Sequence, residues 1–417
     1  MSLMSDLNQK ALRRGVPLSV HLDVTYRCNE RCEHCYLDHD GDGEMNTAEI
    51  KALLDQLADS GVFFLTISGG EPLIRPDCFE IIEHARKLRF NVKFKTNAVL
   101  IREKQAKRLR ELNVEQVQIS VYSHRAEVHD GISKVPGSLK RTIAGIRLLK
   151  SQGLKVTIAN VLMKGNIHDA EGVRQLAAEI GAHYTLDPTI TPMMNGDTSL
   201  LRLRISSDSL RTVFQNSDLV GNVEDFCAPP PPVDEDALEG YPCSAGHTAC
   251  YVSPRGEVYP CVQFPISCGN VREQEFLDIW QNSPQLLEVR AIRGKHLTTC
   301  SSCNHLGTCT RCPGLAYMEG NMRGPSTADC EKSFVRTGIV SAGMLARANA
   351  PSLSGLIQIR PYVASQQGSH SGGATPGCAL QPVSPTNPQG QGLAPAGVNP
   401  AQRHYATRLQ FQSPSRT

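Results

Sequence analysis

The sequence lacks any apolar run that approaches the roughly 18 residues needed to span a bilayer as a helix. Its N-terminus, MSLMSDLNQKALRRG, lacks the apolar core of a signal peptide. It also lacks an excess of either charge, because 43 basic residues stand against 41 acidic ones. This balance argues against a dedicated nucleic-acid surface and a basic membrane-binding face. We therefore expect a cytoplasmic protein with neither nucleic acid nor membrane as partner.

Cysteine, by contrast, is abundant, with 15 residues in a chain of 417. Disulfides are rare in reducing compartments, and cysteines separated by two or three residues are more often metal ligands. At this length and with 40% hydrophobic residues, the chain is expected to form two or three domains with ordinary cores. The cysteine clusters therefore carry the main functional signal.

Apolar segments of strand length alternate with longer periodic segments between residues 18 and 186. The expected strands cover residues 19–25, 63–68, 91–96, 116–121, 155–161 and 183–186. Asn46 and Glu49 form a helix-capping signal between the first two strands, with Gly61 after the end of that helix, and a second helix begins at Ser138 and stops at Gly153. Such repeats predict an α/β fold whose parallel sheet curls into a barrel, with function at the C-terminal strand ends.

The composition changes after this region, which we assign to residues 18–225, behind a short N-terminal segment at 1–17. Four consecutive prolines predict a stiff linker over 226–242. The cysteine-rich segment 243–337 has few periodic apolar residues, so bound metal should contribute to its folding. The remainder, 338–417, contains no acidic residue and becomes rich in Pro, Gly, Ser and Gln, which predicts a disordered tail.

Three cysteines, Cys28, Cys32 and Cys35, follow the first strand with the spacing CxxxCxxC. A structural zinc or iron-sulfur knot is one interpretation of such a triple. At the C-terminal end of a barrel strand, three thiolates can instead hold three irons of a cubane and leave the fourth iron open. The second strand ends in TISGGEPL, where Gly69 and Gly70 allow the backbone to approach a ligand closely.

Together, the CxxxCxxC and GGEP motifs resemble the radical S-adenosylmethionine superfamily. The resemblance implies a partial (β/α)6 barrel in which Cys28, Cys32 and Cys35 hold a [4Fe-4S] cluster that binds S-adenosylmethionine. It also implies that the reduced cluster cleaves this cofactor to a 5′-deoxyadenosyl radical, which abstracts hydrogen from an unactivated carbon. The cofactor contacts implied are Gly69, Gly70 and Glu71 at the methionine amine, His34 beside adenine, and Thr96, Asn97, Ser120 and Arg141 at the ribose and carboxylate.

The downstream cysteines are Cys243, Cys250, Cys261, Cys300, Cys303, Cys309, Cys312 and Cys330. Their pattern, with Gly256 before Cys261, is similar to the SPASM extension of radical enzymes that modify peptides, although two residues rather than the usual three separate Cys309 from Cys312. The resemblance implies two auxiliary [4Fe-4S] clusters. One would use Cys243, Cys250, Cys261 and Cys312, and the other Cys300, Cys303, Cys309 and Cys330. Cys268 is an alternative to Cys250, and two structural zinc sites are the alternative to the clusters. Cys78, Cys227 and Cys378 receive no role.

The resemblance implies an oxidoreductase of the peptide maturase type, which cross-links or otherwise alters C–H positions of a ribosomally made precursor peptide. The auxiliary clusters would accept or relay the electron left when the substrate radical closes to product. A flavodoxin- or ferredoxin-type electron donor is the expected partner. The short segment 1–17 leaves no room for a peptide-binding domain, so a separate recognition protein is a further expected partner.

Two other functions stay open at this point. The first is biosynthesis of a tetrapyrrole, heme or quinone cofactor by the same radical chemistry. The second is a non-catalytic iron-sulfur or zinc scaffold. The GGEP motif disfavours this function, because a scaffold does not need a backbone surface that binds a cofactor.

Overall fold

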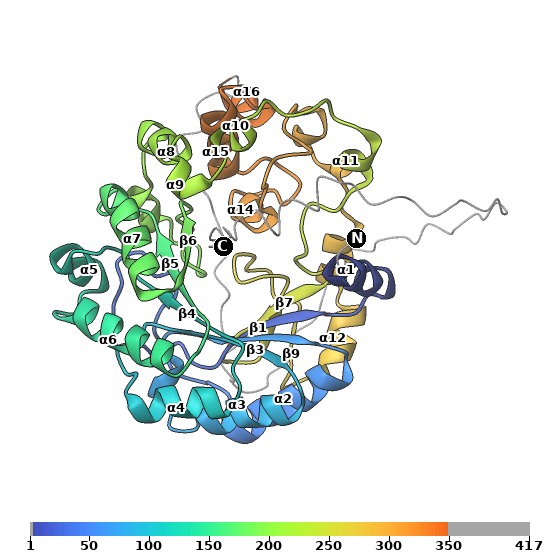
Figure 1. The fold of residues 1–417 in the computed structure, drawn as a ribbon. Helices are drawn as coiled ribbons and strands as arrows, with labels where there is room; N and C mark the ends of the chain where they lie inside the picture. The colour runs from blue at the N-terminus through green and yellow to red at the C-terminus, as the bar shows by residue number, and fades with distance from the viewer. Residues whose placement is uncertain (1–2, 349–417) are drawn as a thin grey trace, which may run out of the picture.

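A curved sheet with helices around its outside forms the core of the chain (Figure 1). The computed structural model describes residues 3–348. Six parallel strands follow one another in chain order, as predicted: β1 (Ser19–Asp23), β2 (Phe64–Ser68), β3 (Asn91–Thr96), β4 (Gln116–Ser120), β5 (Val156–Val161) and β6 (His183–Asp187). The α/β fold and its parallel sheet are therefore confirmed.

Helices after the strands cover the outer face of this sheet (Figure 1). They are α2 (Thr47–Asp59), α3 (Cys78–Lys87), α4 (Glu103–Glu111), α5 (Ala126–Ser133), α6 (Ser138–Ser151) and α7 (Ala170–Ile180). The expected cap of α2 is present, since Asn46 accepts from the Glu49 amide and the Glu49 side chain accepts from the Asn46 amide. The apolar residues of α2, such as Leu53 and Leu57, pack against strand residues such as Val20 in one core.

Three short strands of the cysteine-rich segment continue the same sheet. They are β7 (Ala249–Val252), β8 (Glu257–Tyr259) and β9 (Gly269–Asn270). β7 pairs in parallel with β1, with Ser19 opposite Ala249, and the next two pairings are antiparallel. An unpaired β1 edge would leave a row of backbone donors and acceptors open. The sheet therefore crosses the sequence boundary that we placed at residue 243.

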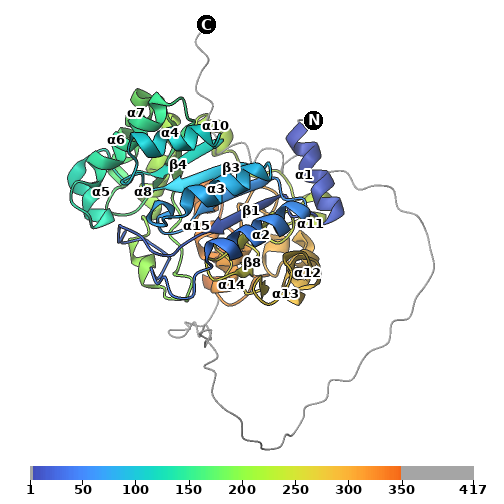
Figure 2. The same ribbon diagram turned by 90° about the horizontal axis from the view of Figure 1, so that it is seen from below.

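The remaining helices lie around the cysteine-rich part and the linker. They are α1 (Leu3–Arg14), α8 (Ser207–Phe214), α9 (Ser217–Val220), α10 (Val223–Phe226), α11 (Glu235–Glu239), α12 (Phe276–Asn282), α13 (Pro284–Ala291), α14 (Pro313–Met318), α15 (Thr327–Thr337) and α16 (Ala342–Ala348). Figure 2 shows α12, α13 and α14 on the side of the sheet away from α4, α6 and α7.

Two further sequence-based expectations concern the disordered tail and membrane-spanning helices. The expected tail, 338–417, contains helix α16 at its described beginning, and its part beyond residue 348, including Cys378, lies outside the described residues. Between residues 3 and 348, none of the helices combines the length and apolar character that crossing a membrane requires.

Candidate active site

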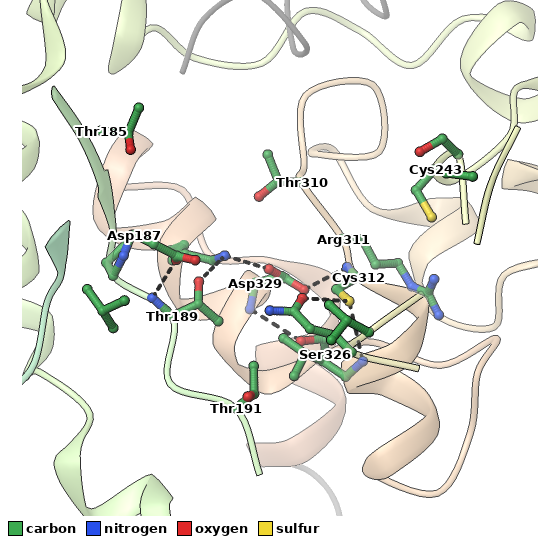
Figure 3. A pocket seen from close by; sticks show the side chains of 18 of the residues that line it. Thr185, Asp187, Thr189, Thr191, Cys243, Thr310, Arg311, Cys312, Ser326 and Asp329 are labelled. Carbon is green, nitrogen blue, oxygen red and sulfur yellow. Dashed lines mark hydrogen bonds and ion pairs between the residues drawn. The ribbon is translucent and has the colours of Figure 1, made fainter. Parts of the chain in front are cut away.

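One large cavity, about 1750 Å³ in volume, lies between the inner face of the curved sheet and the cysteine-rich segment. Each of the six parallel strands contributes to its lining, for example with His21, Thr66, Lys95, Ser120, Asn160 and Thr185. Figure 3 shows Cys243 and Cys312 across the cavity from Thr185 and Asp187 of β6. The sheet and the cysteine-rich segment therefore enclose the site together.

The first thiols lie in the loop that follows β1, and Cys28, Cys32 and Cys35 all line the cavity. Backbone bonds fix the loop: the Cys35 amide donates to the Cys32 carbonyl at 3.0 Å, and the Glu30 amide donates to the Cys28 sulfur at 3.4 Å. Burial raises the pKa of the Cys28 thiol to about 12 and also raises the pKa values of Cys32 and Cys35. Thiolates at these positions would therefore need a nearby positive charge, such as that of a bound metal, to stabilise them.

Two rings flank this loop. The Tyr122 hydroxyl lies 3.3 Å from the Cys32 sulfur, and the His34 ring meets the Tyr122 ring edge-on at 4.8 Å between centroids. Burial lowers the pKa of His34 to about 4, so the imidazole is neutral near pH 7. Its Nδ1 atom is buried without a hydrogen-bond partner. His34 therefore offers a neutral planar ring to the cavity, which suits the adenine contact expected of it.

The GGEP turn lies directly against the cysteine loop, and Gly69 and Gly70 line the cavity. The Gly70 amide donates to the Thr25 carbonyl at 2.8 Å, and the Glu71 amide donates to the Arg27 carbonyl at 2.9 Å. Glycine is required, because a Cβ atom at Gly70 would lie 2.3 Å from the Arg27 carbonyl oxygen. The two motifs singled out in the sequence thus form one surface.

The structure places Glu71 behind this surface. Its side chain is fully buried and does not line the cavity. The carboxylate accepts hydrogen bonds from the Thr96 hydroxyl at 2.9 Å, the Asn97 amide at 2.8 Å and the Leu73 amide at 3.0 Å. Burial raises the pKa of Glu71 to about 7, although these donors oppose the rise. Glu71 therefore joins the GGEP turn to the end of β3.

Three of the other expected cofactor contacts, Thr96, Asn97 and Ser120, line the cavity. The Asn97 side chain donates to the Asn29 side chain at 2.7 Å, next to the Cys28 thiol. Arg141 does not line the cavity, and its guanidinium donates to the Pro136 carbonyl at 3.1 Å near the surface. The structure thus brings all the expected cofactor residues but Glu71 and Arg141 to the cavity wall.

The downstream cysteines fall into separate groups. Cys300, Cys303, Cys309 and Cys330 all line the cavity and interact electrostatically with one another. A second group brings Cys243, Cys261 and Cys312 close to one another, whereas Cys250 lies in the apolar core with Cys268. Within residues 3–348, no three His, Cys, Asp or Glu side chains converge as they would around a single metal ion.

Sequence reasoning missed several charged residues of the cavity, among them Lys95. The pattern NVKFKT could have revealed it, because strand alternation places Lys93 and Lys95 opposite the buried Phe94. Burial lowers the pKa of Lys95, and the nearby Asp23 and Cys261 partly offset this. Lys95 thus places an amine in the cavity within electrostatic reach of Cys261.

Comparisons with known proteins agree with this geometry. Residues 22–177 match the model of the radical SAM superfamily, and residues 243–304 match that of an iron-sulfur cluster-binding domain, SPASM. The mycofactocin maturase MftC of Mycobacterium tuberculosis is 31% identical over 306 residues, which are 70% of this chain and 77% of that protein. The chain belongs to the radical SAM superfamily. Its barrel and SPASM region are those of an enzyme that uses S-adenosylmethionine and iron-sulfur clusters.

Two other relatives and one solved structure are also similar to this radical SAM chain. The AdoMet-dependent heme synthase of Methanosarcina barkeri is 29% identical over 73% of this chain and 93% of that protein. The subtilosin biosynthesis protein AlbA of Bacillus subtilis is 29% identical over 73% of this chain and 68% of that protein. Streptococcus suis SuiB, solved with S-adenosylmethionine, has the same fold, with a TM-score of 0.63, 19% identity and coverage of 78% of this chain and 81% of that one.

Proposed function

We propose that this radical SAM enzyme oxidatively modifies C–H positions of a ribosomally made peptide. The observation that carries the proposal is one shared cavity, which is lined by the first thiol triad, by Gly69 and Gly70, and by the distal thiols Cys243, Cys300, Cys303, Cys309, Cys312 and Cys330. A shared cavity lets one substrate lie between the site of radical formation and the auxiliary sulfur sites. The names of the relatives MftC and AlbA, a maturase and a bacteriocin biosynthesis protein, support a peptide substrate.

The first site would hold the cofactor in the following way. Cys28, Cys32 and Cys35 would bind a [4Fe-4S] cluster whose open iron takes S-adenosylmethionine, and the bound pair supplies the 5′-deoxyadenosyl radical. The backbone at Gly69 and Gly70 would contact the methionine part, with Glu71 supporting the turn from behind. The polar groups for the ribose and carboxylate would be Thr96, Asn97 and Ser120, and Arg141 would have to turn inward to join them.

The chain's own residues orient the substrate and exclude water. Pockets for small ligands enclose about 300–1,000 Å³, so a cavity of about 1750 Å³ leaves room for an extended substrate beside the cofactor. The distal thiols would hold two auxiliary [4Fe-4S] clusters that receive the electron left after product closure. An electron donor of the flavodoxin or ferredoxin type and a separate peptide-recognition protein complete the proposed system.

A second candidate function is modification of a tetrapyrrole. It is favoured by the heme synthase relative, which matches this chain over 93% of its own length. The cavity volume fits a tetrapyrrole substrate as well as a peptide segment, because both are larger than ordinary small-molecule ligands.

The test begins with anaerobically reconstituted, reduced protein and S-adenosylmethionine alone. We expect 5′-deoxyadenosine, and its absence from protein with confirmed iron content would contradict a radical enzyme and favour a scaffold. The second step adds either a precursor peptide encoded beside the gene or a tetrapyrrole. A peptide that loses hydrogen in mass spectrometry supports the proposal, whereas turnover of the tetrapyrrole alone overturns it in favour of the second candidate.

A further inference from the structure

Tyr122 lies just beyond the end of β4, and hydrogen bonds fix its backbone. Its amide donates to Nδ1 of His129 at 3.2 Å, and its carbonyl accepts from the side-chain amides of Asn166 at 2.8 Å and Asn160 at 3.3 Å. These three partners are each 1–2% exposed. Burial lowers the pKa of His129 to about 4, so its ring is neutral near pH 7 and Nδ1 is free to accept. The backbone of Tyr122 therefore has one defined position.

The ring of Tyr122 is fixed as well. It stacks on the His129 ring with 5.2 Å between centroids and 28° between planes, and it meets the His34 ring edge-on at 4.8 Å. It also belongs to a small apolar core with Ile132, and Cys32 packs against this core. A tyrosine ring is placed by two side-chain torsions only, and these contacts restrict both. The hydroxyl group at the end of the ring is therefore held in place.

The hydroxyl lies beside the Cys32 sulfur and donates to it at 3.3 Å. Within residues 3–348 it has no other hydrogen-bond partner. Tyr122 is 5% exposed, and a buried tyrosine hydroxyl needs a partner. The Cys28 sulfur accepts from the Glu30 amide at 3.4 Å, whereas no backbone amide of the described chain donates to Cys32. Tyr122 is thus the donor that this part of the chain offers to the Cys32 sulfur.

The direction of this hydrogen bond suits a Cys32 that binds metal. The free thiol carries a proton, which it donates to the Glu30 carboxylate at 3.5 Å. A cysteine that binds iron has lost this proton, so its sulfur only accepts. The hydrogen bond from Tyr122 is then charge-assisted, and such bonds are stronger than those to a neutral acceptor. Tyr122 therefore fits the cluster that we propose for the first triad.

We propose that Tyr122 is a positioning residue for radical formation: its hydroxyl donates to the Cys32 thiolate of the cofactor-binding cluster and makes that cluster easier to reduce. The inference rests on the proposed function, because it concerns the cluster of the first site. Reduction moves one electron from the flavodoxin- or ferredoxin-type donor to the cluster, and the proton stays on Tyr122. The added negative charge spreads onto the sulfur atoms, and hydrogen bonds to these atoms help to set the reduction potential.

The test compares tyrosine variants of the anaerobically reconstituted full chain. Tyr122→Phe keeps the ring and its packing but removes the donor. Tyr184→Phe is the matched control, because the Tyr184 hydroxyl donates at 3.0 Å to Oδ1 of Asn160, which also contacts the Tyr122 carbonyl. The control thus removes a hydroxyl from the same hydrogen-bond network without removing a donor to sulfur. Both variants should retain the iron content of the parent.

Redox titration followed by electron paramagnetic resonance measures the reduction potential of the first cluster. A chain with all three thiols of the first triad changed to Ala provides the spectrum of the auxiliary sites for subtraction. We expect a more negative potential in Tyr122→Phe, so that the ratio of reduced to oxidised cluster at a fixed solution potential falls about fivefold. Tyr184→Phe should keep the parental potential. An unchanged potential in Tyr122→Phe, or equal shifts in the two variants, would overturn the inference.

A second replacement keeps the donor at Tyr122 and strengthens it. Difluorotyrosine, with a fluorine on each side of the hydroxyl, is a stronger donor of nearly the same shape, so the potential should become less negative than that of the parent. A shift in the same direction as in Tyr122→Phe would contradict the inference. A parent that shows no cluster signal beyond the triad-free chain overturns the proposed first site and the inference with it. A parent that forms 5′-deoxyadenosine while its potential ignores both replacements overturns the inference alone.

Discussion

Gly69 lies so close to Thr25 that a Cβ atom on the glycine would stand 2.2 Å from the Thr25 carbonyl oxygen. Thr25 follows β1 and leads into the cysteine loop, whereas Gly69 follows β2. The close approach of these two backbones brings the candidate cluster ligands and the candidate cofactor surface into one site.

Gly69→Ala should therefore abolish cofactor cleavage. Gly69 has φ = +139°, and the added carbon must displace backbone that leads to Cys28. Gly153→Ala is the matched control, since Gly153 also has positive φ (+72°) but nothing within 4 Å of its Cβ position. The control should lose about 1 kcal/mol of stability and retain 5′-deoxyadenosine formation. Equal activity of the two variants would contradict this role of the contact.

Glu71→Gln should weaken both the fold and cofactor binding. The carboxylate accepts from two backbone amides and the Thr96 hydroxyl, and an amide in its place would oppose one of these donors with its own NH2 group. We expect the free energy of unfolding to fall by about 1–3 kcal/mol, together with a higher KM for S-adenosylmethionine. Urea unfolding and 5′-deoxyadenosine assays measure the two effects. Thr96→Ser, which keeps the hydroxyl, should have nearly the same free energy of unfolding and the same KM for S-adenosylmethionine as the parent.

Arg75→Met should destabilise the chain strongly. Arg75 is 7% exposed and donates to the Val24 and Met45 carbonyls at 3.0 Å each, besides its 2.6 Å ion pair with Asp77. Removing it leaves a carboxylate and two carbonyls without their donor, which costs about 3–5 kcal/mol. The iron content should fall as well, because Val24 precedes the cysteine loop.

An ion pair at the surface provides the control for Arg75. Arg108 also pairs with a carboxylate at 2.6 Å, that of Glu83, but both side chains are more than one third exposed. Arg108→Met should therefore cost at most about 1 kcal/mol and leave the iron content unchanged. Similar losses in the two variants by denaturant unfolding would mean that burial does not set the strength of the Arg75 interactions.

Changing Cys300 and Cys303 together to Ala should separate radical formation from turnover. Both thiols line the cavity in one group with Cys309 and Cys330. The variant should still form 5′-deoxyadenosine and should give no modified peptide. Product formation at the parental rate would refute a role of this group in electron transfer.

The sequence by itself determined the repeated strand-helix order and the two motifs at the carboxyl ends of β1 and β2. These features depend on local patterns: alternation within strands, the cap at Asn46, and cysteines separated by two or three residues. The grouping of Cys300, Cys303, Cys309 and Cys330 came from the family resemblance, because spacing alone does not join Cys330 to the other three.

Only the tertiary structure decided where each side chain points. The register of β7 on β1 turns Cys250 into the core, and contacts between β2 and β3 turn Glu71 behind the glycine surface. The register of β3 with β2 and β4 places Lys95 in the cavity, near Cys261, a residue far away in the chain. Spacing along a sequence cannot reveal these positions, because a strand presents alternate residues to opposite faces and only its partner strands decide which face meets the cavity.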